Sequence, residues 1–198
     1  MEIITCEQVS AGHPDKICDQ VADAIVTDCL GHDRNSRVAI ECLIKDSTLI
    51  IAGELTSAHK PHYHDLARKV MERIYGPEEG SAMPLQIELL VREQSQDIAL
   101  GVNIGGAGDQ GMMYGYATNE TPELLPIPFA VATRFLQLLR DYPSGMFRPD
   151  AKAQVSFDCG SGRITTFLCS VQHSADVEPA DFRDIIESMM MTTAAQLG

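Results

Sequence analysis

The run Gly12-His13-Pro14-Asp15-Lys16 combines residue types that could bind a phosphate group with the help of a metal ion. Pro14 favours the first turn of a helix, where its missing N–H group would have no intrahelical partner. The free N–H groups and the dipole of that helix end would then face His13, Asp15 and Lys16. In such a site Asp15 would bind Mg²⁺, and the other two would contact phosphate oxygens. The same run also fits an ordinary capped surface helix, and both interpretations stay open on these five residues alone.

Charged residues within β-rich runs form a second set of candidates. Glu41 lies inside an apolar run, and Glu54 lies near the end of the next one. A carboxylate in an apolar strand is costly to bury without a cation or a donor, so two of them on paired strands indicate binding of a cation or an amine. Both could instead point to water. Asp150 and Lys152 have strand spacing, which puts them on one face, where they could hold one ligand.

A glycine-rich stretch in the middle of the chain formally matches the dinucleotide fingerprint G-x-G-x-x-G at Gly106–Gly111. That fingerprint requires a helix directly after it, but here the run Tyr114–Asn119 and two prolines follow, so we reject it. A glycine-lined loop of this kind suits close backbone contact with a ligand, with Asp109 accepting from a ribose or an amine. A flexible interdomain linker is the alternative.

Histidine and cysteine give weaker signals. His59, His62 and His64 resemble a metal cluster, but no fourth ligand has a suitable spacing, so a surface helix is the preferred interpretation. The six cysteines are scattered and form no CxxC pair. This indicates reduced, mostly buried thiols in a cytoplasmic protein without structural zinc.

Helices and hairpins predicted from periodicity must position these candidates. Apolar residues at helical spacing predict helices over 15–30, 63–75, 128–142 and 179–196, and β-rich runs predict strands over 37–45, 48–56, 85–93, 151–158 and 163–173. The order helix–hairpin–helix therefore occurs twice. It predicts an α+β protein with two domains of similar build, 1–100 and 101–198, each with helices on one face of a small sheet.

The charge of the chain limits its partners. The formal net charge is −13, which makes nucleic acid a poor partner because an acidic surface repels a phosphate backbone. A polyphosphate ligand would need metal ions or basic residues from elsewhere. The sequence also has no apolar run long enough to span a bilayer and no charged-then-apolar leader, so neither a membrane anchor nor export is expected.

Four motifs in one order carry a family resemblance that covers nearly the whole chain. The runs VSAGHPDKI (9–17), GAGDQGMMYGYATNE (106–120), RPDAKAQV (148–155) and VQHS (171–174) closely resemble methionine adenosyltransferase, the S-adenosylmethionine synthetase family. The resemblance implies the two-domain α+β fold of the first two parts of that family. It also implies an ATP-dependent reaction in which the sulfur of L-methionine attacks C5′ of ATP and displaces the triphosphate, which is then hydrolysed to pyrophosphate and phosphate.

The resemblance assigns catalytic and nucleotide-binding residues by position. His13 would contact the triphosphate near the breaking bond and, with Lys152, would be catalytic. The nucleotide would be held by His13, Lys152, Asp109 and Asp150. The leaving group is a polyanion, so the chemistry requires cations that neutralise it and an in-line approach of the sulfur.

Methionine and metal sites follow from the same resemblance. Glu54, Gln94 and Asp109 would bind methionine, with Glu54 pairing with its amine. Asp15 would bind Mg²⁺, and Glu41 would serve a K⁺ site. In the family the site lies between two subunits, so that Glu54, Gln94 and Asp109 can serve the site of a neighbour.

The sequence also departs from the family pattern. Ala11 stands where the family usually has Glu, and the lid between Gln94 and Gly106 is shorter than in typical bacterial members. The motifs of the family's third part, which brings several basic residues and another Mg²⁺-binding Asp, are missing. We therefore expect a subunit of a split enzyme that needs a second, basic chain. The alternative is a non-catalytic regulatory or nucleotide- and methionine-binding relative.

Overall fold

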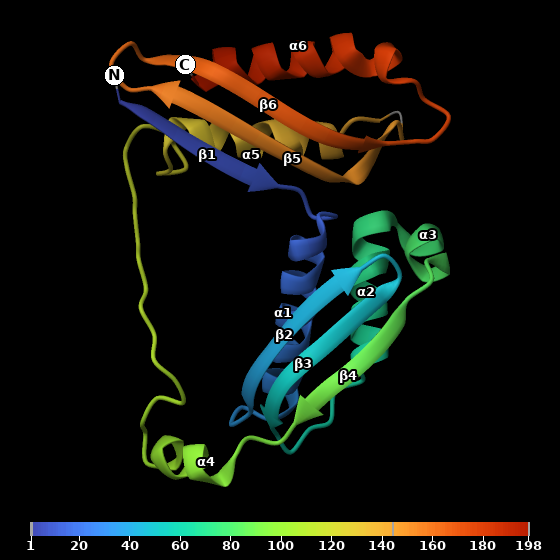
Figure 1. The fold of residues 1–198 in the computed structure, drawn as a ribbon, viewed down its shortest axis with the longest axis vertical. Helices are drawn as coiled ribbons and strands as arrows, with labels where there is room; N and C mark the ends of the chain where they lie inside the picture. Colours follow the sequence, from blue (N-terminus) through green and yellow to red (C-terminus); the bar gives the residue numbers. More distant parts are fainter. Residues whose placement is uncertain (1, 144, 198) are drawn as a thin grey trace. The chain divides into compact units, whose positions relative to one another are not determined.

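The computed structural model describes residues 2–143 and 145–197 and divides the chain into two compact units. Pro14–Tyr114 forms the continuous unit, whereas Met1–His13 and Gly115–Gly198 together form the composite unit. Each unit holds one three-stranded sheet with helices packed on it (Figure 1). The predicted α+β class is thereby confirmed.

The continuous unit is built around the sheet β2-β3-β4. Strands β2 and β3 are antiparallel, and β4 lies parallel to β3 on its other side. Its elements in chain order are α1 (Pro14–His32), β2 (Arg37–Lys45), β3 (Thr48–Thr56), α2 (Tyr63–Tyr75), α3 (Pro77–Ala82), β4 (Gln86–Arg92) and α4 (Gln96–Asn103).

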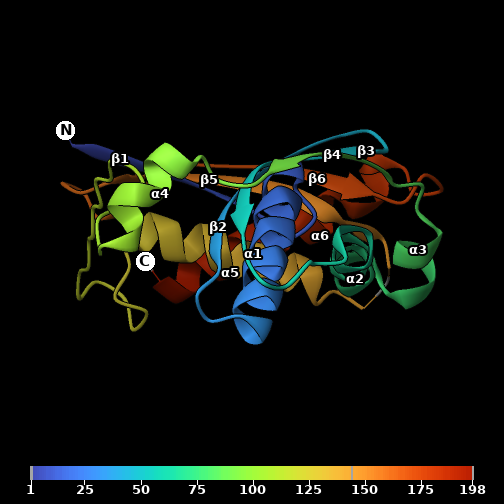
Figure 2. The same ribbon diagram turned by 90° about the horizontal axis from the view of Figure 1, so that it is seen from below.

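Apolar periodicity explains how the continuous unit packs. Helix α1 buries one side chain per turn, at Ile17, Val21, Ile25 and Cys29. Because residues four apart lie on one face of a helix, these side chains form a stripe that packs against the sheet. Helix α2 contributes Val70 and its neighbours to the same core. Figure 2 shows both helices on the same side of the strands.

The composite unit is built around the antiparallel sheet β1-β5-β6. Its core combines residues of both helices with the inward face of β5, including Phe135, Phe182, Ala153 and Val155. The elements in chain order are β1 (Ile3–Val9), α5 (Ile127–Arg140), β5 (Phe147–Asp158), β6 (Arg163–His173) and α6 (Pro179–Leu197).

The structure confirms both predicted hairpins and the helices around them. The residue pair Lys45↔Thr48 leaves Asp46 and Ser47 as a two-residue turn between β2 and β3. Strand β1 and the short helices α3 and α4 are additional elements that the sequence analysis did not predict. Because β1 pairs with β5, the residues before Pro14 join the composite unit. The two units defined by contacts between residues therefore differ in their boundaries from the two segments, 1–100 and 101–198, into which the sequence alone divides the chain.

The sheet face opposite the helices in the continuous unit carries exposed apolar side chains. Leu43 on β2 is 58% exposed and Leu90 on β4 is 55% exposed. Both alternate with Ile40, Ile51 and other inward residues, so they lie on the outer face. Within the described part of the chain, the helices lack the length and apolar character that crossing a bilayer requires.

Candidate functional site

The turn that precedes α1 is hydrogen-bonded along the start of β5. The Ser10 N–H donates to the Ala151 carbonyl at 2.9 Å, and the Gly12 N–H donates to the Pro149 carbonyl at 3.1 Å. The Ser10 hydroxyl accepts from the Ala151 N–H at 2.6 Å and donates to the Pro149 carbonyl. These bonds bring together two runs that the sequence analysis singled out separately, and we call this contact the seam.

Close packing at the seam explains why a glycine stands before His13. Gly12 is buried, and a Cβ atom added to it would lie 2.6 Å from both the carbonyl carbon and the Cβ of Pro149. Atoms in ordinary contact are 3.5–4.0 Å apart, so only glycine fits without displacing backbone. The half-buried His13 follows directly and is held by its N–H, which donates to the Ser10 carbonyl at 3.1 Å.

Asp150 and Lys152 both lie in β5, which begins four residues before the predicted strand 151–158 and includes both. Lys152 is paired in register with Val9, the last residue of β1, so it lies close to the start of the seam. Its Nζ lies 3.1 Å from Glu7 Oε1, an ion pair between two partly exposed side chains. The composite unit therefore brings His13, Asp150 and Lys152 to one end of the β1–β5 pair.

The remaining candidates lie on the continuous unit, beginning with Asp15 in the first turn of α1. Its carboxylate is exposed at the helix N-terminus, where a negative charge is favoured by the helix dipole. The neighbouring Lys16 pairs with Asp19, with Nζ and Oδ2 2.8 Å apart. Asp15 also lines a groove that includes Cys18 and Cys42. Burial raises the pKa of the Cys42 thiol to about 12 and also raises the pKa of Cys18.

Glu41 and Glu54 lie on paired strands, as the sequence predicted, and on one face of the sheet. The residue pairs Glu41↔Ala52 and Ala39↔Glu54 make the two carboxylates diagonal neighbours on the outer face. Glu54 is half-buried and lies beside Arg92 in the register of β3 and β4. The backbone at Gly53 has φ +133°, and a Cβ atom there would overlap the Ala39 carbonyl oxygen, so this strand end requires glycine.

Gln94 and the glycine-rich loop meet at the same sheet end as Glu54. Strands β3 and β4 are parallel, so their carboxyl ends share one edge, and Gln94 follows β4 by two residues. Gly108 lies against Gln94, since a Cβ atom added to it would be 3.7 Å from Gln94 Nε2. Gln94 Oε1 is buried and has no hydrogen-bond partner among the described residues. A buried polar atom without a partner is costly and can indicate a missing ligand.

The loop around Asp109 has no helix after its glycines. The next helix begins at Ile127, so the rejection of a dinucleotide fingerprint at Gly106–Gly111 is confirmed. Asp109 is exposed, and one of its carboxylate oxygens accepts from the Gln110 N–H at 2.7 Å. Its other oxygen is a potential acceptor for a ligand.

The histidines differ partly from the surface-helix interpretation. His62 and His64 are exposed at the start of α2, as that interpretation requires. His59 is instead half-buried and contacts Asp28 on α1, with His32 stacked on its ring. The sequence signal for this group is the i, i+4 spacing of Asp28 and His32, which places both on one face of a helix.

The comparisons with known proteins agree with the motifs. The family model described as "S-adenosylmethionine synthetase, N-terminal domain" matches residues 1–96, and that of the "central domain" matches residues 104–197. The S-adenosylmethionine synthase of Mesoplasma florum is 37% identical over 212 residues, covering 98% of this chain and 55% of that protein. The corresponding protein of Prochlorococcus marinus subsp. pastoris is 41% identical over 202 residues, covering 89% of this chain and 48% of that protein.

A solved structure supports the same relationship. The unusual S-adenosylmethionine synthetase of Campylobacter jejuni superimposes with a TM-score of 0.79 at 29% sequence identity, covering 96% of this chain and 53% of that one. The chain thus spans about half the length of the curated relatives that it matches. On the evidence of both domain matches, this chain belongs to the S-adenosylmethionine synthetase family.

Proposed function

We propose that this chain provides the N-terminal and central parts of a methionine adenosyltransferase that makes S-adenosylmethionine from ATP and L-methionine. In the reaction a bond forms between the methionine sulfur and C5′ of ATP, and the C5′–O bond to the triphosphate breaks. The triphosphate is then hydrolysed to pyrophosphate and phosphate. The observation that carries the proposal is the seam, because it joins the His13 turn to the Asp150–Lys152 segment through short backbone contacts.

Residues at the seam would act on the triphosphate and the nucleotide. His13 would donate a hydrogen bond near the breaking bond, where negative charge develops as the triphosphate leaves. Lys152 would leave its partner Glu7 and bind a phosphate oxygen instead. This exchange costs little, because an exposed ion pair contributes little to the stability of the fold. Asp150, with Asp109 from the glycine-rich loop, would accept hydrogen bonds from the nucleoside.

Residues at the carboxyl ends of β3 and β4 would hold methionine. Glu54 is half-buried and would accept from the ammonium group of the amino acid. Gln94 would use its buried Oε1, which has no hydrogen-bond partner among the described residues, in the same contact. Asp109 follows the glycine that packs against Gln94, so it could reach the same amino acid.

The carboxylates of Asp15 and Glu41 suit the proposed cations. Mg²⁺ and K⁺ are hard ions that prefer oxygen ligands, and both carboxylates are exposed. Asp15 would hold Mg²⁺, and Glu41 would serve K⁺. When bound, the cations supply charge neutralisation for the leaving triphosphate.

We further propose that a second polypeptide completes the site. The chain carries a net charge of −13, and its lysines at the candidate site, Lys16 and Lys152, are both paired with carboxylates. A triphosphate needs more positive charge than these two side chains offer. Exposed apolar residues such as Leu43 and Leu90 give a partner a surface to cover.

Reconstitution tests this proposal. The chain is purified alone and together with a candidate chain that carries the family's C-terminal part, and S-adenosylmethionine formation from ATP and methionine is measured. We expect product only with the pair, and a loss of about 100-fold or more in turnover for His13→Ala. The exposed His64→Ala is the matched control and should retain full turnover. A folded pair that makes no product contradicts the split-enzyme proposal, and an active His13→Ala pair contradicts the role of His13.

A non-catalytic binding subunit is the second candidate. The ion pairs that occupy Lys16 and Lys152, and Ala11 in place of the family's usual Glu, favour it. Isothermal titration of the chain with MgATP and with methionine separates the two functions. Binding of either ligand by a pair that never forms product would support the regulatory function.

A further inference from the structure

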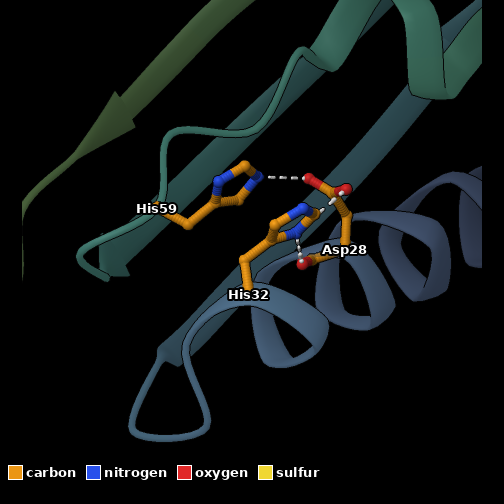
Figure 3. A group of neighbouring side chains, drawn as sticks. All are labelled: Asp28, His32 and His59. Atoms are coloured by element: carbon orange, nitrogen blue, oxygen red, sulfur yellow. Dashed lines mark hydrogen bonds and ion pairs between the residues drawn. The ribbon is translucent and has the colours of Figure 1, made fainter.

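Three potential metal ligands gather at the C-terminal end of α1, outside the site discussed above (Figure 3). Asp28 and His32 are one helical turn apart on α1, and His59 comes from the segment between β3 and α2. Each side chain offers one ligand atom, and these atoms all lie within 4.8 Å of one another. A metal ion with bonds of about 2.0–2.2 Å to nitrogen and oxygen could therefore reach all three after small side-chain movements.

One hydrogen bond of this group is of the kind that orients a metal ligand, whereas another joins two of the proposed ligands and would be replaced by the bound ion. His59 Nε2 lies 2.7 Å from Asp28 Oδ2, and the rings of His32 and His59 stack with centroids 4.0 Å apart. His32 Nδ1 lies 2.8 Å from the backbone carbonyl oxygen of Asp28. A carbonyl only accepts, so Nδ1 must carry the proton, and the lone pair of a neutral ring is then on Nε2. A histidine that ligates a metal typically donates its other N–H to such a carbonyl.

A separate network fixes the segment that carries His59. The Ala58 N–H donates to Asp33 Oδ2 at 2.9 Å, and the His59 N–H donates to Ser57 Oγ at 3.0 Å. The Ser57 and Ser36 hydroxyls are 2.7 Å apart, which ties the segment to the turn after α1. The backbone that carries His59 is therefore positioned before any ion binds, which lowers the entropic cost of binding.

We propose that Asp28, His32 and His59 bind a divalent transition-metal ion. Two imidazole nitrogens and one carboxylate oxygen suit Zn²⁺ and its neighbours Co²⁺ and Ni²⁺, whereas Mg²⁺ and Ca²⁺ prefer oxygen alone. The His32 side chain is 59% exposed, so water can complete the coordination. The bound ion cross-links the end of α1 to the segment after β3 and stabilises the continuous unit.

Cobalt titration of the full chain tests this site. Co²⁺ can occupy the same sites as Zn²⁺, and its visible absorption spectrum depends on the ligands that bind it. We expect one equivalent to bind with a nitrogen- and oxygen-ligand spectrum, and Zn²⁺ to displace it. His32→Gln, His59→Gln and Asp28→Asn should each weaken binding by more than about 100-fold, since the loss of outer-shell partners alone costs 10–100-fold. Zn²⁺ should raise the melting temperature of the wild-type chain, and a chelator should reverse the rise.

The matched controls are His62→Gln and His64→Gln, which remove exposed histidines from the same stretch of sequence. Both should bind Co²⁺ like the wild type. Three results would each overturn the proposal. They are a failure of the chain to bind one equivalent of Co²⁺, an equal loss of Co²⁺ affinity in the control variants, and a near-ultraviolet band that indicates cysteine thiolate ligands. Far-ultraviolet circular dichroism establishes that each variant is folded, and His32→Gln is the least disruptive variant because His32 is largely exposed.

Discussion

Replacing Gly12 with alanine is the sharpest test of the seam. The new Cβ would lie 2.6 Å from the carbonyl carbon and the Cβ of Pro149, so the two segments must separate by about 1 Å to reach ordinary contact. The Gly12–Pro149 hydrogen bond, now 3.1 Å long, would then stretch to about 4 Å and be lost. Overpacking costs about 1–3 kcal/mol and the lost bond about 1 kcal/mol, giving roughly 2–4 kcal/mol in all.

Thermal unfolding measures this loss directly. For a chain of this size, each kcal/mol shifts the melting temperature by about 2–4 °C, so Gly12→Ala should melt roughly 4–16 °C lower. The same change should weaken nucleotide binding, because it displaces Asp150 and Lys152 from the His13 turn. Gly31→Ala is the matched control, since Gly31 is helical and no atom of the described residues lies within 4 Å of its added Cβ. It should stabilise the chain by about 0.4–1 kcal/mol. Equal melting temperatures for the two variants would refute this reasoning.

Three further predictions concern other parts of the fold. Burial raises the pKa of Cys42 to about 12, so iodoacetamide at pH 8 should modify the exposed Cys159 well before Cys42. Peptide mass mapping measures the two alkylation rates, and equal rates would contradict a buried Cys42 thiol. Phe135→Ala should cost about 3–5 kcal/mol in urea denaturation, whereas the exposed Met191→Ala should change stability by less than about 0.5 kcal/mol. Hydrogen bonds from the N–H groups of Ala58 and Asn35 lower the pKa of Asp33 in the folded chain. The Asp33 carboxylate therefore stabilises the fold when the pH is above the pKa that Asp33 has in the unfolded chain. This contribution is lost as the pH falls through the pKa of Asp33 in the folded chain. Asp33→Ala should therefore melt below the wild type at pH 7 and together with it in strong acid; a difference that persists there would exclude this mechanism.

Local patterns were sufficient to predict most helices and strands. The one-per-turn spacing of Ile17, Val21 and Ile25 fixes the buried face of α1, and Asp46-Ser47 fixes the β2–β3 turn. These features depend on neighbours in the sequence, so periodicity and turn chemistry reveal them. Strand β1 was not predicted because its partner residues lie far away in the chain, as the 151-residue separation of Thr5 and Ser156 illustrates.

The candidate site follows the same division between local and distant information. The run 12–16 indicated a helix mouth, but nothing in it indicated that Gly12 packs on Pro149. Similarly, His59 meets Asp28 across 31 residues, a contact that only the packing of the segment after β3 against α1 creates. Contacts of this kind depend on how helices and strands pack against one another. Composition and residue spacing do not predict that packing.

The pairing of β1 with β5 has a consequence for the order in which the chain is made. Strand β1 leaves the ribosome before β5, because its partner residues follow about 150 positions later, as for Thr5 and Ser156. At about 5–20 residues per second this interval lasts roughly 8–30 s. The continuous unit, whose residues are contiguous, can complete its sheet within that time. During the wait, β1 exposes Ile3, Ile4 and unpaired backbone groups, so we expect this strand to be prone to aggregation in the nascent chain.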